Sequence, residues 1–286
     1  MGGASPKGIL LGLIGAPIAH SAAPAMHEGA AAALGLRCFY HLIEVAGADE
    51  AALRAMLDGV RALGFAGVNV TYPYKEAVVP LLDELAPAAA NVGAVNTIAV
   101  RGGRLIGYNT DCSGFGKAVR RAIGDIAGQT IALIGAGGVG KAIGVALSES
   151  GAGDIRIVDR EPAKARALAQ SLARRGGAKS CESVEEALAG AHGLVNATAV
   201  GMIPSRDTPV PFALLHGDLW VADAIYQPLW TPLLDAARER GAKVMTGREL
   251  AIDQAMDAFA IFTGREAPPG IMAEAFDRVV SSRQAA

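Results

Sequence analysis

Short apolar runs alternate with helix-forming stretches along the first 112 residues of the chain. Each run has the length of a strand and ends at glycine or polar residues, which is typical of strands buried in a sheet. Gly102 and Gly103 separate two of these runs and indicate a tight hairpin, so at least one strand of this half is antiparallel. The predicted strands are 9–14, 67–71, 94–100 and 104–108, and the predicted helices run from Ser21 and Pro24 to about Leu34 and from Asp49 to near Gly64.

From residue 130 onward, strands and helices alternate more regularly. Such alternation predicts a parallel sheet with helices on both faces, the doubly wound arrangement. Ser113 is expected to cap the helix that follows Asp111, and Thr231 with Pro232 to open the helix before the last strand. The predicted strands are 131–134, 155–158, 194–196, 219–222 and 243–245, and further helices begin at Gly138 and span 247–263.

These patterns predict an α/β protein with two domains. Residues 1–112 would form an N-terminal α/β domain that binds the substrate and carries the catalytic groups. Residues 113–246 would form a Rossmann-type domain, whose doubly wound parallel sheet binds a dinucleotide. Residues 247–286 would form C-terminal helices that pack back on the first domain. A length of 286 residues agrees with two domains of ordinary size.

Charge and composition narrow the class of partner. The 28 acidic and 26 basic residues nearly cancel and are scattered, so the chain shows no electrostatic footprint for nucleic acid. The N-terminal apolar run is far shorter than the roughly 20 residues that a membrane-spanning helix needs. Three widely spaced cysteines argue against a disulfide framework, and neither they nor the histidines show metal-ligand spacing. We expect a small-molecule partner, a cytoplasmic location, no metal, and a monomer or homodimer.

A glycine-rich turn between a predicted strand and a predicted helix carries the pattern of a dinucleotide-binding loop. Gly135, Gly137 and Gly140 stand where the tight turn, the approach of the backbone to pyrophosphate and the helix packing require glycine. A phosphate loop for nucleoside triphosphates would need serine or threonine after Lys141, and Ala142 stands there instead. The cofactor-binding residues expected in this loop are Gly135, Ala136, Gly137, Gly138 and Val139.

An acidic residue follows the second strand of this half. Asp159 lies about 20 positions beyond Gly140, the spacing at which a carboxylate binds the adenosine ribose hydroxyls. An acid there favours NAD, because it would repel the 2′-phosphate of NADP. Arg160 and Lys164 follow closely and would attract that phosphate, so NADP stays an alternative. Asp159 and Arg160 are both expected at the cofactor.

Lys75 and Asp111 each follow a predicted strand of the first half and form a candidate proton-transfer pair. An alcohol that gives up hydride must also lose its hydroxyl proton, and a lysine held beside a carboxylate can take it without a metal. The lysine can act as a base, or it can stay charged and stabilise the developing alkoxide, and the sequence leaves both open. An ordinary surface ion pair is the competing interpretation.

Five ordered segments resemble the shikimate dehydrogenase family, and they are Gly15-Ala-Pro-Ile-Ala-His-Ser21, Asn69-Val-Thr-Tyr-Pro-Tyr-Lys75, Gly93-Ala-Val-Asn96-Thr, Asn109-Thr-Asp111 and Gly135-Ala-Gly-Gly. The resemblance runs over about 11–262 and is greater to the NAD-using quinate/shikimate dehydrogenase branch than to the NADP-using biosynthetic branch. It implies reversible oxidation of the C3 alcohol of shikimate, quinate or both to the 3-dehydro acid, with NAD or NADP as the acceptor.

The resemblance also implies roles for single residues. Lys75 and Asp111 would be the catalytic pair. The residues that would bind the hydroxyls of the substrate ring are Thr71, Asn96 and Gln254. Ser21 and Tyr226 would bind the carboxylate, and Thr198 and Gly247 would lie near the cofactor. Asn69, Ser113 and His20 are expected to be structural.

One position departs from the family pattern. The family has a second hydroxyl in its Ser-x-Ser-Pro motif, whereas this chain reads Ser21-Ala22-Ala23-Pro24. Ala23 removes one donor to the carboxylate, and a hydrogen bond to a charged group contributes about 1.5–3 kcal/mol. Two alternatives therefore stay open beside shikimate and quinate. The substrate could be a related cyclic polyhydroxy or amino-substituted acid, or the chain could be a dinucleotide-binding regulatory protein without catalysis.

Overall fold

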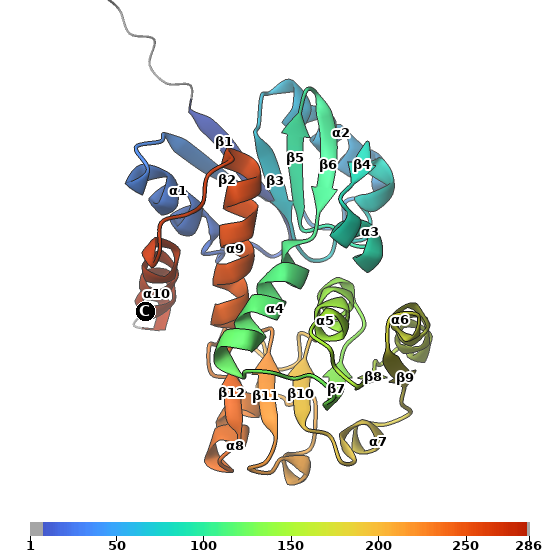
Figure 1. Ribbon diagram of the computed structural model, residues 1–286. Coiled ribbons are helices and arrows are strands. Elements are labelled where there is room, and N and C mark those ends of the chain that lie inside the picture. Colours follow the sequence, from blue (N-terminus) through green and yellow to red (C-terminus); the bar gives the residue numbers. More distant parts are fainter. Residues whose placement is uncertain (1–7, 285–286) are drawn as a thin grey trace, which may run out of the picture. The chain divides into compact units, whose positions relative to one another are not determined.

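The computed structural model describes residues 8–284 and contains two compact units (Figure 1). The first unit is formed by the chain up to Thr110 and again from Gln254, and the second unit by Asp111–Asp253. Both units are α/β, which confirms the predicted fold class. The divisions lie two residues before the first predicted boundary and seven residues after the second.

The elements of the first unit are β1 (Ile9–Gly15), α1 (Ala23–Ala33), β2 (Cys38–Glu44), α2 (Glu50–Ala62), β3 (Gly67–Val70), β4 (Glu84–Leu85), α3 (Pro87–Val92), β5 (Thr97–Arg101), β6 (Arg104–Tyr108), the part of α9 (Gly247–Thr263) from Gln254 onward, and α10 (Ile271–Gln284). They form a six-stranded sheet of order β2-β1-β3-β5-β6-β4. β1 pairs in parallel with β2 and β3, whereas β5 runs antiparallel to β3 and β6. Gly102 and Gly103 both have positive φ in the turn between β5 and β6, which confirms the predicted hairpin.

Helices cover both faces of this sheet. Successive residues of a strand point to opposite faces, so β1 contributes to two cores. Ile14 shares one core with Leu57 of α2, and Leu13 shares the other with Phe262 of α9. α10 lies along α1. The C-terminal helices are thereby part of the first unit from Gln254 onward.

The elements of the second unit are α4 (Thr110–Ala122) from Asp111, β7 (Thr130–Ile134), α5 (Gly138–Glu149), β8 (Asp154–Val158), α6 (Pro162–Ala173), β9 (Gly177–Ser180), α7 (Val184–Leu188), β10 (Gly193–Asn196), β11 (Trp220–Asp223), α8 (Pro232–Glu239), β12 (Lys243–Met245) and the start of α9. All six strands are parallel, in the order β12-β11-β10-β7-β8-β9. The order reverses between β7 and β10. Doubly wound sheets bind ligands at this point, outside the carboxyl ends of the strands.

Two layers of helices enclose the second sheet. Leu188 of α7 and Leu234 of α8 share a core with Val221 of β11. On the other face, Gly144 of α5 lies against Leu172 of α6. Within residues 8–284, no helix is both long and apolar enough to cross a membrane.

Several elements differ from the sequence prediction. β2 was not predicted; it is an edge strand in which Tyr40 alone is buried, so its residues do not form a buried apolar run. Helix α1 begins at Ala23 after Ala22, so Ser21 is not its cap residue. Helix α4 begins at Thr110, so Ser113 lies inside it, and the expectation that Ser113 caps it is wrong. The reason lies in Asn96, whose Oδ1 accepts the Thr110 N–H at 2.8 Å and satisfies the first turn from outside.

Candidate active site

A group of mostly buried polar side chains lies at one end of the two central strands of the first sheet, where β3 ends and β5 begins. Asn96 stands at its centre. Its Oδ1 accepts hydrogen bonds from the backbone N–H of Thr110 (2.8 Å) and from Oγ1 of Thr97 (3.0 Å). Its Nδ2 donates to Oγ1 of Thr110 at 2.9 Å and to Oε1 of Gln254 at 3.4 Å. We call Asn69, Asn96, Thr97, Thr110 and Gln254 the polar cluster.

Gln254 reaches the polar cluster from a distant part of the chain. It lies near the middle of α9 and is half-buried. Its Oε1 lies 3.4 Å from both Asn96 Nδ2 and Thr110 Oγ1. Amide and hydroxyl groups donate and accept hydrogen bonds, so this group has the chemistry to bind neighbouring hydroxyls of a ring. The structure thus brings Asn96 and Gln254 together, as their predicted common role requires.

Thr71 and Lys75 lie on a turn at the same end of the central strands. Thr71 follows β3, and its N–H donates to the carbonyl of Ile14 at the end of β1 (2.9 Å). Its carbonyl accepts the N–H of Tyr74 at 2.9 Å, which closes the turn. The carbonyl of Lys75 accepts the N–H of Val95 at 2.8 Å, one residue before Asn96. Lys75 is therefore held beside the polar cluster by its own backbone, and its side chain is half-buried.

Ser21 and Ala23 lie after β1 at the start of α1. Oγ of Ser21 accepts the N–H of Ala23 at 3.2 Å, and Ser21 is half-buried. Ala23 is the first residue of the helix and has no hydroxyl of its own. This segment consequently offers one hydroxyl donor, where the family motif offers two.

Asp111 is the first residue of the second unit and lies in the first turn of α4, where its side chain is buried. A carboxylate is favourable at a helix N-terminus. Burial, reinforced by the carboxylates of Glu149 and Asp111, raises the pKa of the neighbouring Cys112 thiol to about 12. Cys112 is therefore neutral near pH 7, which excludes it as a thiolate nucleophile.

The glycine-rich loop connects β7 to α5 in the second unit. Gly135 has φ +105°, which a residue with a side chain rarely adopts. A Cβ on Gly140 would lie 2.0 Å from the Gly135 carbonyl oxygen, so the loop closes tightly only with glycine there. Around Gly137 the space is open, and no side chain caps the first turn of α5. These features fit a pyrophosphate that approaches the backbone at a helix N-terminus.

Asp159 lies directly after β8 and contacts this loop. Its Oδ2 accepts the N–H of Ala136 at 2.7 Å, and its Oδ1 accepts the N–H of Glu161 at 2.8 Å. Each carboxylate oxygen keeps a second lone-pair site, so Asp159 could still accept from ribose hydroxyls. Arg160 is exposed, whereas Nζ of Lys164 pairs with Oε1 of Glu161 at 2.7 Å. An acidic and a basic residue, Asp159 and Arg160, therefore follow β8 directly, and Asp159 contacts the loop.

The other predicted residues of the second unit lie at the carboxyl edge of its sheet. A Cβ on Gly135 would lie 2.9 Å from Cγ2 of Thr198, so the segment after β10 borders the glycine-rich loop. Gly247 lies against the backbone of Ala224 and Ile225, which precede Tyr226 in the segment after β11. Tyr226 is half-buried.

Sequence analysis missed a buried polar group beneath these segments. Asp223 ends β11, and its Oδ1 accepts from the N–H of Ile225 (2.9 Å) and from Nδ2 of Asn196 (3.0 Å). Its Oδ2 accepts from Oγ1 of Thr231 at 2.8 Å. Asn196 also accepts from the N–H and the hydroxyl of Thr198. A polar residue at the end of a buried parallel strand is the signal that could have identified Asn196 and Asp223.

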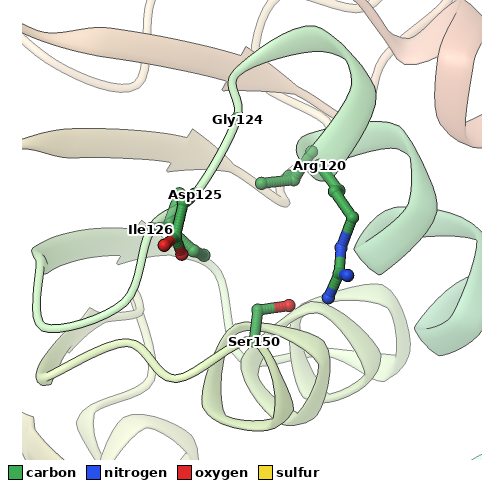
Figure 2. A pocket seen from close by; sticks show the side chains of 6 residues that line it. Arg120, Gly124, Asp125, Ile126 and Ser150 are labelled. Carbon is green, nitrogen blue, oxygen red and sulfur yellow. The ribbon is translucent and has the colours of Figure 1, made fainter.

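A separate pocket of about 450 Å³ lies at the far end of α5 (Figure 2). It is lined by Val119, Arg120, Gly124, Asp125, Ile126 and Ser150. Ser150 follows the last residue of α5, so this pocket lies about 18 Å along the helix from the glycine-rich loop. The helix presents carbonyls there, which disfavour an anion. None of the predicted site residues lines this pocket.

Comparison with known proteins identifies relatives for both units. Residues 13–98 match the family model described as "Shikimate dehydrogenase substrate binding domain", and residues 117–203 match "Shikimate / quinate 5-dehydrogenase". The chain is 42% identical to a shikimate dehydrogenase (NADP(+)) of Streptomyces avermitilis, over 90% of this chain and 91% of the relative. It is also 42% identical to a quinate/shikimate dehydrogenase (NAD(+)) of Corynebacterium efficiens, over 90% of this chain and 94% of the relative.

A solved structure agrees with the same comparison. The quinate dehydrogenase of Corynebacterium glutamicum in complex with NAD superposes with a TM-score of 0.87 at 38% identity. The match covers 95% of this chain and 99% of that one.

Proposed function

Because this chain belongs to the shikimate dehydrogenase family, we propose that it oxidises the C3 alcohol of shikimate, quinate or both to the 3-dehydro acid, reversibly, with a nicotinamide dinucleotide as the acceptor. Family membership confirms the resemblance predicted from the five sequence segments. The observation that carries the proposal is the buried polar cluster beside Lys75, because it supplies paired amides and hydroxyls for a polyhydroxylated ring.

Lys75 and Asp111 are proposed as the proton-transfer pair. When bound, the nicotinamide would accept the hydride from C3. The C3 hydroxyl must then release its proton, and Lys75 would receive it or would stabilise the alkoxide that forms, with Asp111 sharing the charge. We assign the proton to the pair, because the two groups would act on it together.

Binding roles are proposed for the remaining residues by their chemistry. Asn96, Gln254 and Thr71 would hold the ring hydroxyls. Ser21 and Tyr226 would donate to the carboxylate, since hydroxyl donors suit an anion. The cofactor would lie on the glycine-rich loop with Asp159, Arg160, Thr198 and Gly247 around it. NAD is the favoured cofactor because Asp159 contacts the loop itself, whereas Lys164 is engaged by Glu161.

A related cyclic acid is the second candidate substrate. It is favoured by Ala23, because the segment before α1 lacks the second hydroxyl that the family motif has for the carboxylate. Such a substrate would have a different or differently placed group at that end of the ring. The alternative of a regulatory protein without catalysis has no such support, because the relatives at 42% identity are dehydrogenases.

Initial rates of cofactor reduction test the function. Shikimate and quinate would each be supplied with NAD and with NADP, and reduction is expected with at least one pair. Tight cofactor binding with turnover of neither acid would refute the proposed substrates. If neither cofactor binds, the dehydrogenase assignment itself is wrong.

Three variants test the catalytic pair. Lys75→Ala is expected to lower kcat by about 10²–10⁴-fold, the usual contribution of general acid–base catalysis. Asp111→Asn should also lower kcat, and the double variant should lose little more than the worse single one, because residues that act as a unit are not additive. Lys179→Ala removes an exposed lysine from the edge strand β9 and serves as the control. An unchanged kcat in Lys75→Ala would contradict the assignment.

A further inference from the structure

A tyrosine on an edge strand of the first unit donates a hydrogen bond to the polar cluster. Tyr40 lies in β2 and is buried. Its hydroxyl donates to Oδ1 of Asn69, in β3, at 2.8 Å. Since β1 lies between β2 and β3, the Tyr40 side chain reaches across one whole strand to make this bond. Tyr40 thereby connects the outer edge of the sheet to the polar cluster.

The hydrogen bonds beyond Tyr40 have a single consistent direction. Asn69 accepts from Tyr40 at Oδ1, so its Nδ2 donates to the Asn96 carbonyl (3.1 Å) and to Oγ1 of Thr97 (3.0 Å). A threonine hydroxyl has one hydrogen, and Thr97 gives it to Oδ1 of Asn96 at 3.0 Å. Because Oδ1 of Asn96 accepts from Thr97 and from the Thr110 N–H, its amide nitrogen faces Oγ1 of Thr110 and Gln254. The Tyr40 hydroxyl is the first donor in this series.

Aromatic packing holds the Tyr40 ring in place. The imidazole of His27 stacks on it, with ring centroids 4.9 Å apart and planes inclined by 25°. Burial lowers the pKa of His27 to about 3, so the imidazole is neutral near pH 7. The rings of Phe259 and Phe262, both in α9, also lie close to His27, with 6.1 and 5.9 Å between ring centroids. The helix that carries Gln254 therefore packs on the same aromatic group.

We propose that Tyr40 is a positioning residue for the substrate: through Asn69 and Thr97, its hydroxyl helps the Thr110 N–H to hold in place the Asn96 amide that binds a ring hydroxyl. The inference rests on the proposed function, since it assumes that Asn96 contacts the substrate. Without the tyrosine hydroxyl, Oδ1 of Asn69 loses its donor, and of the bonds named above only those from Nδ2 to the Asn96 carbonyl and to Thr97 still hold this amide. Asn69 would then hold Thr97 and the Asn96 carbonyl less firmly, and the Asn96 side chain would be less well fixed.

Tyr40→Phe tests the inference by removing a single oxygen atom. The KM for shikimate, or for whichever acid the protein turns over, is expected to rise about tenfold, the range for a buried amide that loses a partner. The Kd for the dinucleotide should not change, because the glycine-rich loop belongs to the other unit. kcat should change less than KM, because Lys75 and Asp111 are untouched.

Tyr74→Phe is the matched control. Tyr74 is also buried in the first unit, and its hydroxyl donates to the Val45 carbonyl (2.8 Å) and accepts the Ala48 N–H (2.9 Å). The substitution removes an equivalent buried hydroxyl that has no bond to the polar cluster. It should lower stability to a similar extent and leave the KM for the acid unchanged. Equal rises in KM for both variants would overturn the inference.

A second variant tests the series downstream and replaces Tyr40→Phe if that variant does not fold. Thr97→Val interrupts the bond between Asn69 and Asn96 and should also raise the KM for the acid. Together, the two substitutions should raise KM little more than either one, because they break the same series. If the two rises in KM multiply in the double variant, the substitutions cause independent losses and the inference is overturned.

Asn96→Ala separates this inference from the proposed function. If Asn96→Ala leaves the KM for the acid unchanged, the proposed binding role of Asn96 is wrong, and the inference falls with it. If Asn96→Ala raises KM and Tyr40→Phe does not, the binding role stands and the positioning role of Tyr40 alone is refuted.

Discussion

Asp223 gives the second unit a dependence of stability on pH that can be worked out from the structure. Its carboxyl group is fully buried at the end of β11, under the segments that carry Thr198 and Tyr226. Burial raises the pKa of Asp223 from 3.8 to about 6, although the three hydrogen bonds from Ile225, Thr231 and Asn196 act in the opposite direction. The folded protein therefore holds a proton on Asp223 more tightly than the unfolded chain does.

The sign of the effect follows from this difference. The proton on Asp223 contributes its full stabilisation below the unfolded pKa of 3.8, and the contribution is lost as the pH rises through about 6. A difference of about two pKa units corresponds to about 3 kcal/mol over the whole titration, of which about 2 kcal/mol is lost between about pH 4.5 and about pH 7.5. Asp223→Asn should abolish this loss, because its amide oxygen can still accept from Ile225 and Asn196 and carries no titratable proton.

Tryptophan fluorescence provides the assay, because both tryptophans of the chain, Trp220 and Trp230, belong to the second unit. Urea unfolding of the wild type and of Asp223→Asn would be followed from about pH 4.5 to about pH 7.5. The wild-type free energy of unfolding minus that of the variant should fall by about 2 kcal/mol over this range. Asp235→Asn, at a partly exposed position of α8, controls for the lost charge. A difference curve for Asp223→Asn that stays flat would refute the buried, proton-holding carboxyl group.

Two further substitutions test the cofactor and the carboxylate positions. Asp159→Ala should weaken NAD binding by about tenfold and affect NADP less, because it removes both the proposed ribose acceptor and the bond to the Ala136 N–H. If calorimetric Kd values for NAD and NADP keep the wild-type ratio, Asp159 does not contact the ribose. Ala23→Ser restores the second hydroxyl of the family motif and should lower the KM for shikimate by about tenfold, as expected for a hydrogen bond to a charged group. If steady-state rates give an unchanged KM, the substrate carboxylate does not bind at the start of α1.

Periodicity identified most of the architecture, and the exceptions have physical causes. The parallel strands of the second unit are short apolar runs buried on both faces, so β7, β10 and β11 are evident from the sequence. β2 is an edge strand in which only Tyr40 is buried, so it lacks the buried apolar run that marks the central strands. The start of α4 depends on Asn96, which is distant in the sequence, and local capping rules could not place it.

In the candidate site, too, features set by local sequence were predictable, and features set by tertiary contacts were not. The glycine-rich loop and Asp159 were predictable because their spacing along the chain reflects a fixed strand-turn-helix geometry. The contact between Gln254 and Asn96 was anticipated only through the family resemblance, since 158 positions separate the two residues. Thr97, Thr110 and Tyr40 were not assigned roles, because their importance arises from hydrogen bonds that form only once β2, β3, β5 and α9 are assembled.

Transfer of an isotope label tests the central claim most directly. Shikimate and quinate carrying deuterium at C3 would be oxidised with NAD and with NADP, and the reduced cofactor would be isolated and weighed by mass spectrometry. We predict reduced cofactor that contains the deuterium, formed at a rate about 10²–10⁴-fold lower with Lys75→Ala. Reduced cofactor without the label would show that hydride leaves another carbon, and no reduction with either acid would contradict the proposed activity.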